Sequence, residues 1–215
     1  MFRMDKKAAK RAAFFYGGAM HVRIQLEGQD RQMFHSLLRE GVEVEVRLGR
    51  SVHETLKDDL QIPEQVIEQD IQSLFLNNHP VDDLGIQIQE SGSVLSLSAA
   101  MPGLVGACMR RGGTYAGLRQ GISWSENEAE QVRQEKGCLR VKLFNFMAPN
   151  LGPLFLSRGV QVGGNCLAQV LKGLTEAERD RIVGFYVNDT ENDVRNPELI
   201  EQLSAEETVK LVVDV

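Results

Sequence analysis

The sequence predicts an α+β protein built from two similar units, because one order of sequence patterns occurs twice along its 215 residues. An alternating apolar and polar run at Val22–Leu26 is followed by a second run at Val42–Val46 and then by a helical pattern. The same order returns at Leu139–Leu143 and Val160–Val162. Alternation with a period of two indicates half-buried strands, and a repeat of this length indicates two similar domains.

The first strand of each unit leads into an apolar loop. We expect alternate residues of these strands to be buried, namely Val22, Ile24 and Leu26, and then Leu139, Val141 and Leu143. The loops contain the clusters Met33, Phe34, Leu37 and Leu38, and then Leu151, Leu154, Phe155 and Leu156. Such apolar clusters favour a packed turn of helix over free coil.

A helix is predicted after the second strand of each unit. In the first unit Ser51 and Glu54 have the spacing of a capping box, and the residues on the buried face are Val52, Leu56 and Leu60. In the second unit Asn165 is the predicted N-cap, and the buried face holds Leu167, Val170, Leu171 and Leu174. Thr175–Glu178 marks a second short helical turn.

Each unit then shows an apolar triplet that ends in asparagine, Leu74–Asn77 and Tyr186–Asn188, followed by a turn and a closing strand. The closing strand at Val209–Val213 is almost continuously apolar, which predicts a central strand. Two antiparallel strands, one helix and a last strand beside the first describe a β-grasp, a mixed sheet wrapped on one helix. The predicted fold class is therefore α+β, with tandem β-grasp domains at residues 20–103 and 138–215.

Residues 104–137 form a glycine-rich connector between these domains. It contains the acidic run Ser125–Glu130. Its apolar residues are Leu104, Val105, Tyr115, Leu118, Ile122 and Trp124. These are too many for a solvated linker, so we expect part of the connector to dock on a domain.

Residues 1–19 form a basic N-terminal arm, and residues 1–20 hold five basic side chains and one acidic one. The arm lacks the continuous apolar core of a secretory signal. Three interpretations stay open: a disordered basic arm, a short amphipathic helix, or an over-long start with Met20 as the true initiator.

Composition limits the function classes. Residues 21–103 carry six basic and fourteen acidic side chains, which argues against nucleic acid as a partner. No apolar run approaches the roughly 20 residues of a membrane span. Cys108, Cys138 and Cys166 form no C-x-x-C pair, which predicts reduced thiols in a cytoplasmic protein. No histidine has ligand spacing, so we expect no metal.

The first unit resembles the ubiquitin-like sulfur carriers, the small subunit of molybdopterin synthase and the thiamine sulfur carrier. The similarity covers residues 20–103, and the second unit matches only by pattern. The segments that carry it are Leu37–Gly41, Val42–Val46, Ser51–Leu56, Leu76–Asp83 and Glu90–Leu97.

The resemblance implies sulfur transfer through a free C-terminal Gly-Gly, and here the sequence departs from the family. The chain ends Val213-Asp214-Val215, and the first unit ends Met101-Pro102-Gly103 with more chain after it. Cleavage after Gly113 would expose an Arg-Arg-Gly-Gly tail, although a glycine pair in a connector is also ordinary flexible backbone. The candidate interaction or processing region consists of Met101, Gly103, Arg110, Arg111, Gly112 and Gly113.

No catalytic constellation and no cofactor motif is identified in the sequence. We therefore expect a non-catalytic tandem ubiquitin-like module that binds another protein, with a homo-oligomer left open. One alternative is a sulfur-carrier precursor or a component of cofactor assembly. Another is a small-ligand or RNA-binding β-grasp protein, which requires a basic face formed by Arg110, Arg111 and Arg119.

Overall fold

A computed structural model describes residues 19–28, 31–119 and 135–215. These residues form an α+β structure, as predicted, with two compact units. Unit 1 comprises Val44–Ala148, and unit 2 comprises the described residues up to Glu43 together with Pro149–Val215. Nearly all of the basic arm and the acidic run Ser125–Glu130 lie outside the described residues.

The sheet of unit 1 has the strand order β2-β8-β7-β4-β5. The strands are β2 (Val42–Arg47), β4 (Ser73–Leu76), β5 (His79–Pro80), β7 (Ser93–Ser98) and β8 (Lys136–Phe144). Strand β7 runs parallel to β8 and antiparallel to β4. A separate small sheet joins β3 (Arg50–Ser51) to β6 (Gln87–Ile88).

The helical segments of unit 1 are α3 (Val52–Glu54), the turns η2 (Thr55–Asp59) and η3 (Val66–Asp70), α4 (Gly103–Met109) and η4 (Ala116–Arg119). The predicted capping box is confirmed, because the Glu54 N–H donates to Ser51 Oγ at 3.1 Å and the Ser51 N–H donates to Glu54 Oε2 at 2.9 Å. The predicted face of Val52, Leu56 and Leu60 is buried.

The sheet of unit 2 has the strand order β11-β10-β1-β12-β9. The strands are β1 (Met20–Leu26), β9 (Val160–Val162), β10 (Ile182–Val187), β11 (Thr190–Glu191) and β12 (Val209–Asp214). Strand β12 is parallel to β1 and antiparallel to β9, so the prediction that it is a central strand is confirmed. Strand β1 is antiparallel to β10.

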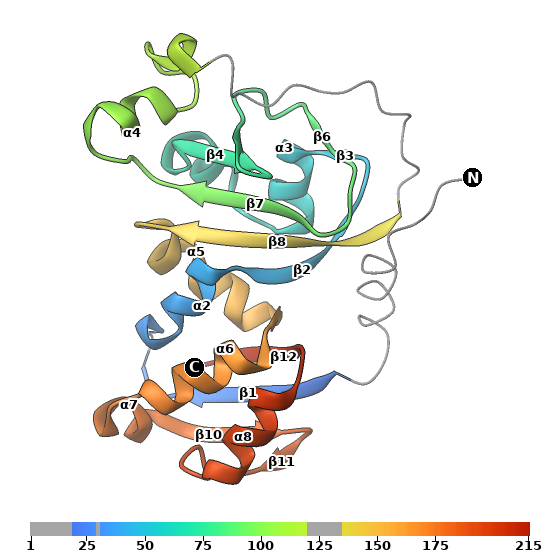
Figure 1. The fold of residues 1–215 in the computed structure, drawn as a ribbon, viewed down its shortest axis with the longest axis vertical. Coiled ribbons are helices and arrows are strands. Elements are labelled where there is room, and N and C mark those ends of the chain that lie inside the picture. The colour runs from blue at the N-terminus through green and yellow to red at the C-terminus, as the bar shows by residue number, and fades with distance from the viewer. Residues whose placement is uncertain (1–18, 29–30, 120–134) are drawn as a thin grey trace. The chain divides into compact units, whose positions relative to one another are not determined.

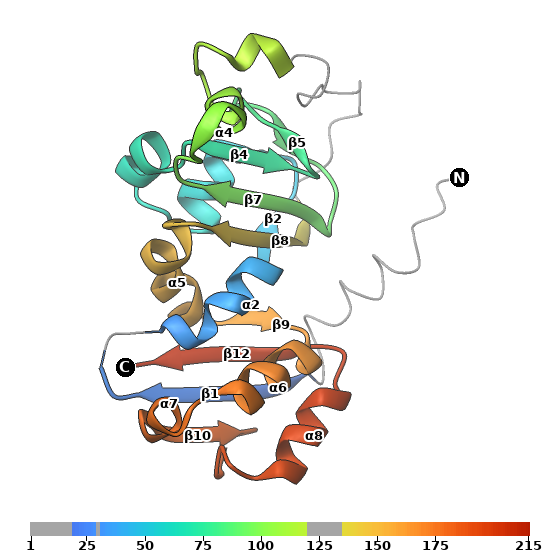
Figure 2. The ribbon, with the colours of Figure 1, turned by 60° about the vertical axis from the view of Figure 1, so that its left-hand side comes forward.

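The helices of unit 2 include η1 (Gln32–Phe34), α2 (His35–Glu40), α6 (Gly164–Gly173), α7 (Glu176–Asp180) and α8 (Pro197–Ala205). Helix α5 (Met147–Arg158) carries the buried residues Leu151, Phe155 and Leu156. The apolar loops therefore contain the helices that we predicted. Figure 2 shows α6 and α8 side by side in unit 2.

Helix α6 begins differently from the prediction. Its N-cap is Gly163, and Asn165 lies inside the first turn without capping it. Gly164 lies so close to α8 that an added Cβ would collide with the carbonyl oxygens of Leu203 and Glu206. The glycine at this position is thus explained by close helix packing.

The pairing of the first strands also differs from the prediction. Each last strand was expected to run beside the first strand of its own segment. Instead β7 lies beside β8, with Ser93 opposite Leu139, and β12 lies beside β1, with Met20 opposite Val209 (Figure 1). Residues 20–103 and 138–215 therefore each contribute strands to both units.

The strands of the two sheets correspond in order when each sheet is followed from the strand that precedes the asparagine turn. Asn77 directly follows β4 and Asn188 directly follows β10, and both have a left-handed φ of 49°. Strand β7 follows β4 in the sheet of unit 1, and β1 follows β10 in that of unit 2. In unit 2, β1 therefore occupies the position that β7 occupies in unit 1. In the same way, β12 corresponds to β8.

Candidate functional site

The predicted interaction or processing region lies on unit 1, at the start of the connector. Met101 precedes Pro102, the N-cap of α4, and Gly103 opens the helix with a φ of 80°. Gly106 is buried against Met101, because an added Cβ at Gly106 would collide with the Met101 carbonyl. This end of the connector is therefore packed.

Arg111 is bound to unit 1 through both its backbone and its side chain. Its N–H donates to the Gln72 carbonyl at 2.7 Å, and its Nη2 donates to the Ile67 carbonyl at 2.8 Å. Burial lowers the pKa of Arg111, while Asp82 and Glu68 act to raise it. The Arg111 guanidinium thus serves to hold the connector on unit 1.

Arg119 is the second anchor of the connector. Its side chain is only 3 % exposed, and its Nη2 lies 2.7 Å from Oδ1 of Asp82. Its Nε donates to the Cys108 carbonyl at 2.6 Å, at the end of α4. From the sequence, Arg119 is expected only in a basic face and Asp82 only among the segments of the resemblance, so the sequence does not reveal that the two residues form an anchor.

The glycine pair Gly112–Gly113 lies in a hydrogen-bonded turn. Gly112 has a left-handed φ of 61°, and its N–H donates to Oδ1 of Asp82 at 3.2 Å. The Gly113 N–H donates to the Arg110 carbonyl at 3.1 Å. Asp82 therefore binds the connector on both sides of Gly113.

These contacts do not assemble the basic face that RNA binding would require. Arg110 is exposed, but the guanidinium groups of Arg111 and Arg119 donate inward to the carbonyls of Ile67 and Cys108. Several large apolar side chains of the connector also face solvent. They are Leu104 (70 % exposed), Val105 (71 %), Tyr115 (49 %) and Leu118 (76 %), which we call the α4–η4 apolar surface.

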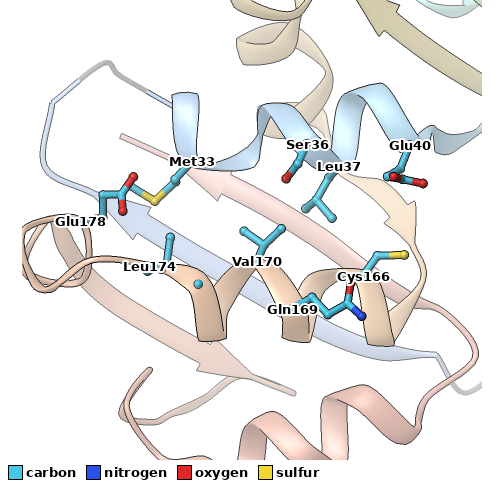
Figure 3. Close-up of a pocket in the computed structure, with 10 residues that line it drawn as sticks. Met33, Ser36, Leu37, Glu40, Cys166, Gln169, Val170, Leu174 and Glu178 are labelled. Carbon is cyan, nitrogen blue, oxygen red and sulfur yellow. The ribbon is translucent and has the colours of Figure 1, made fainter.

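A second candidate site is a groove in unit 2 between α2 and α6, with a volume of about 450 Å³ (Figure 3). Its apolar lining is formed by Met33, Leu37, Val170 and Leu174, and its polar lining by Ser36, Glu40, Cys166, Gln169 and Glu178. Leu37 and Leu174 are buried, so they form the floor. We call this the α2–α6 groove.

Glu178 is held at one end of the α2–α6 groove by a capping box. The Thr175 N–H donates to Glu178 Oε2 at 2.8 Å, and the Thr175 hydroxyl donates to the same oxygen at 2.7 Å. This confirms the predicted helical turn at Thr175–Glu178. Glu40, the last residue of α2, lies at the other end of the groove in Figure 3.

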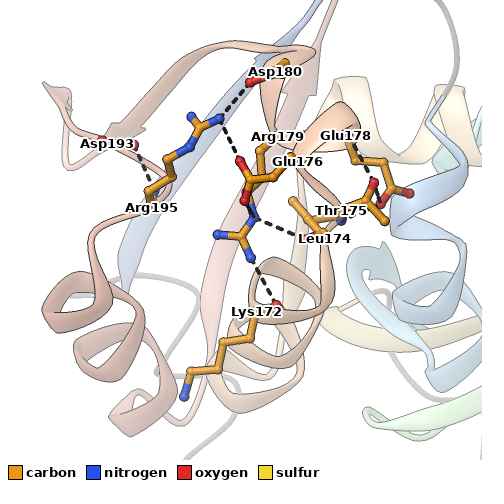
Figure 4. Close-up of polar contacts among 9 residues, drawn as sticks. All are labelled: Lys172, Leu174, Thr175, Glu176, Glu178, Arg179, Asp180, Asp193 and Arg195. Carbon is orange, nitrogen blue, oxygen red and sulfur yellow. Dashed lines mark hydrogen bonds and ion pairs between the residues drawn. The ribbon is translucent and has the colours of Figure 1, made fainter.

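Figure 4 shows the partners of two arginines of unit 2, Arg179 and Arg195. Arg179 donates from Nε to the Leu174 carbonyl and from Nη2 to the Lys172 carbonyl, both at 3.1 Å. Arg195 binds Asp180 at 2.7 Å and Glu176 at 3.2 Å. The groove lining itself contains two carboxylates and no lysine or arginine.

The described residues contain no cluster of three or more metal-ligating side chains, and no helix among them is long and apolar enough to cross a membrane. Cys108, Cys138 and Cys166 are free thiols. Comparison of the chain with protein-family models, with curated proteins and with solved structures gives no match.

Proposed function

We propose that this chain is a non-catalytic module that binds another protein through the α4–η4 apolar surface. The observation that supports this most directly is the outward direction of Leu104, Val105, Tyr115 and Leu118. Of the seven large hydrophobic side chains that are exposed in the described residues, four belong to this surface. Exposed apolar side chains on neighbouring segments, here α4 and the turn that leads into η4, are typical of a protein interaction site.

The anchoring of the connector strengthens this proposal. Arg119 and Arg111 hold the segment to unit 1, so the apolar side chains are presented on a positioned backbone. A preordered surface loses less conformational freedom on binding than a loose segment does. The same contacts would be unnecessary if the connector were only a spacer between two domains.

We further propose that each unit is a β-grasp-like domain that includes one strand from the other half of the sequence. The support in unit 1 is the parallel pair β7–β8, the antiparallel neighbour β4 and the helical segment that Ser51 caps. In unit 2 the parallel pair is β1–β12, with β10 as the antiparallel neighbour.

The two alternatives from the sequence receive less support. A sulfur-carrier precursor must release a chain that ends at Gly113, yet Asp82 binds Gly112 and Arg119 on either side of that residue. Intact-mass analysis of the protein from its native cell tests this alternative. RNA binding lacks the basic face, because Arg111 and Arg119 donate inward.

The double variant Leu104→Ser/Leu118→Ser tests the proposal, with Val183→Ser as a matched control. Val183 is 61 % exposed on β10 of unit 2, so both variants remove exposed apolar groups. Because exposed substitutions change stability by only about 0.5 kcal/mol, all proteins should stay folded. We expect proteins captured from the source cell by the original chain and by Val183→Ser to be lost with the double variant.

Self-association is measured on the same three proteins by light scattering over a range of concentrations. A mass that rises with concentration in the original chain and not in the double variant would identify a second copy as the partner. Capture and mass that are identical for the original chain and the double variant would reject the α4–η4 apolar surface as the binding site.

A further inference from the structure

We propose that the open face of the unit 2 sheet binds a short acidic segment of a partner protein. At the centre of this face lie three basic side chains, His21 and Arg23 on β1 and Lys210 on β12, and we call the surface that they form the β1–β12 face. The proposal gives the protein a second interaction surface. It concerns unit 2 alone, so it does not depend on the α4–η4 apolar surface of unit 1.

Strand alternation places the three basic side chains on one side of the sheet. Val22 and Ile24 of β1 are buried in the core, whereas His21, Arg23 and Lys210 are exposed. Successive side chains of a strand point to opposite faces, so the basic residues lie on the face directed away from the core. Strands β1 and β12 are parallel with His21 opposite Lys210, which makes these two side chains direct neighbours.

Arg23 is positioned by Tyr186 of β10. The guanidinium carbon of Arg23 lies 4.8 Å from the centre of the Tyr186 ring, which is a cation–π contact. Gly184 leaves room for this ring, because an added Cβ at Gly184 would lie 2.8 Å from Cε2 of Tyr186. A guanidinium that stacks on a ring keeps the N–H groups at its edge for a carboxylate. The stack therefore presents Arg23 as a preordered anion-binding group.

The charged groups of the β1–β12 face are arranged with the basic ones at the centre. Among the residues that the structure describes, Arg23 and Lys210 form no ion pair with a carboxylate. The strand register puts two carboxylates at the margins of the same face, Glu191 on the edge strand β11 and Asp214 at the end of β12. These carboxylates confine the positive region, so the face suits a short acidic segment and would repel a long polyanion such as RNA.

The exposure of the basic side chains indicates the kind of partner. Small-molecule sites enclose most of their ligand, whereas His21, Arg23 and Lys210 all face solvent on an open sheet. An acidic protein segment can reach all three at once. Each exposed ion pair contributes little to affinity, so we expect weak binding that falls as the salt concentration rises.

Titration of the full chain with synthetic peptides tests the proposal. The probes are end-blocked hexaglutamate and hexaglutamine, which have the same length and differ in charge, and the readout is the backbone amide shifts in NMR spectra. We expect hexaglutamate to shift the amide signals of His21, Arg23 and Lys210 and to leave that of Lys172 on α6 unchanged. Hexaglutamine should shift none of them, and added salt should reduce the response to hexaglutamate.

Charge variants test the role of each basic residue. Arg23→Gln and Lys210→Gln should each weaken hexaglutamate binding about two- to five-fold, the range expected for one exposed ion pair. Lys172→Gln is the matched control, because it removes an exposed lysine of unit 2 that lies on helix α6 (Figure 4). This control should bind hexaglutamate as tightly as the original chain does.

Variants of Tyr186 test whether the stacked ring positions Arg23. Tyr186→Phe keeps the ring and should bind hexaglutamate as the original chain does. Tyr186→Leu removes the ring and should weaken binding about two-fold, the range of an exposed cation–π contact. Equal affinity in these two variants would contradict the role of the stack.

Three results would overturn the proposal as a whole. They are equal shifts with hexaglutamine, hexaglutamate binding that neither Arg23→Gln nor Lys210→Gln weakens, and shifts that are confined to residues outside β1 and β12. Tighter binding of a single-stranded hexathymidylate than of hexaglutamate at the same amides would also overturn it, because the partner would then be a nucleic acid.

Discussion

Asn188 and His21 are joined by two hydrogen bonds across the sheet of unit 2. The Asn188 N–H donates to the His21 carbonyl at 2.8 Å, and the His21 N–H donates to Oδ1 of Asn188 at 2.9 Å. Asn77 binds Val94 in unit 1 in the same way, with both distances at 2.8 Å. The same asparagine contact therefore holds β1 in one unit and β7 in the other.

Alanine at either asparagine should loosen only the strand that it holds. Asn188→Ala removes the acceptor of the His21 N–H and places alanine at a left-handed φ, which together should lower the free energy of unfolding of unit 2 by about 1–2 kcal/mol. Amide hydrogen exchange should quicken at His21 and not at Val94. Asn77→Ala should give the reverse pattern, and equal effects at both amides would contradict the equivalence.

Two glycines of helix α6 should respond to alanine with opposite sign. Gly164→Ala forces a Cβ against the Leu203 carbonyl and should lower the free energy of unfolding by about 1–3 kcal/mol. Gly173→Ala meets no neighbouring atom and should raise it by up to about 1 kcal/mol, because alanine favours a helix. Urea denaturation measures both, and a stable Gly164→Ala protein would refute the close packing of α6 on α8.

Loss of the Asp82 charge should release the connector from unit 1. Asp82→Asn removes the ion pair between Asp82 and the buried Arg119 guanidinium, which should destabilise residues 103–119 locally by about 1–2 kcal/mol. Hydrogen exchange of α4 should quicken. Asp83→Asn is the control, because asparagine can still accept the Gly85 N–H that Asp83 Oδ1 accepts at 2.7 Å. Equal exchange rates in the two variants would show that Asp82 is not an anchor.

Acid should remove the stabilisation that Glu64 provides. Glu64 accepts from Lys57 and His53, and these hydrogen bonds hold its pKa below the ordinary value. A lowered folded-state pKa means that the stabilisation is present above the unfolded-state pKa, about 4.3 for glutamate, and is lost as the pH falls through the folded value. The Tm of Glu64→Gln should therefore lie below that of the original chain at neutral pH.

The hydrogen bond between Lys57 and Glu64 also sets the upper pH limit of this stabilisation. The hydrogen bond to Glu64 raises the pKa of Lys57, so its contribution is lost only as the pH rises through that raised value. The difference in Tm between the original chain and Glu64→Gln should vanish in acid. A difference that is unchanged in acid would show that the Glu64 charge is not responsible.

Local structure could be predicted from the sequence because it depends on neighbouring residues. The capping box at Ser51 and the central strand Val209–Val213 are visible as short patterns. The sequence does not show which strand pairs with β1 or with β8, because Val22–Leu26 and Leu139–Leu143 bury alternate residues in the same manner. Both strands fit the alternating pattern equally well beside β7 or beside β12. Which pairing forms depends on packing between segments that are distant in the sequence.

The candidate sites were harder to predict for the same reason. Charged residues are normally exposed, so nothing in the sequence indicates that Arg119 is buried. Nor does the sequence indicate that the apolar Leu104 and Leu118 face solvent. The α2–α6 groove brings Leu37 near Val170. Those residues meet only because β1 and the helix after it belong to unit 2.

The placement of β1 in unit 2 is the central claim, and a cysteine cross-link tests it most directly. Arg23 lies opposite Tyr186 across β1 and β10. The variant Arg23→Cys/Tyr186→Cys should form a disulfide on mild oxidation, identified by peptide mass spectrometry. Arg23→Cys/Ser96→Cys, which would join β1 to β7, should not. A disulfide in the second protein and none in the first would contradict the account.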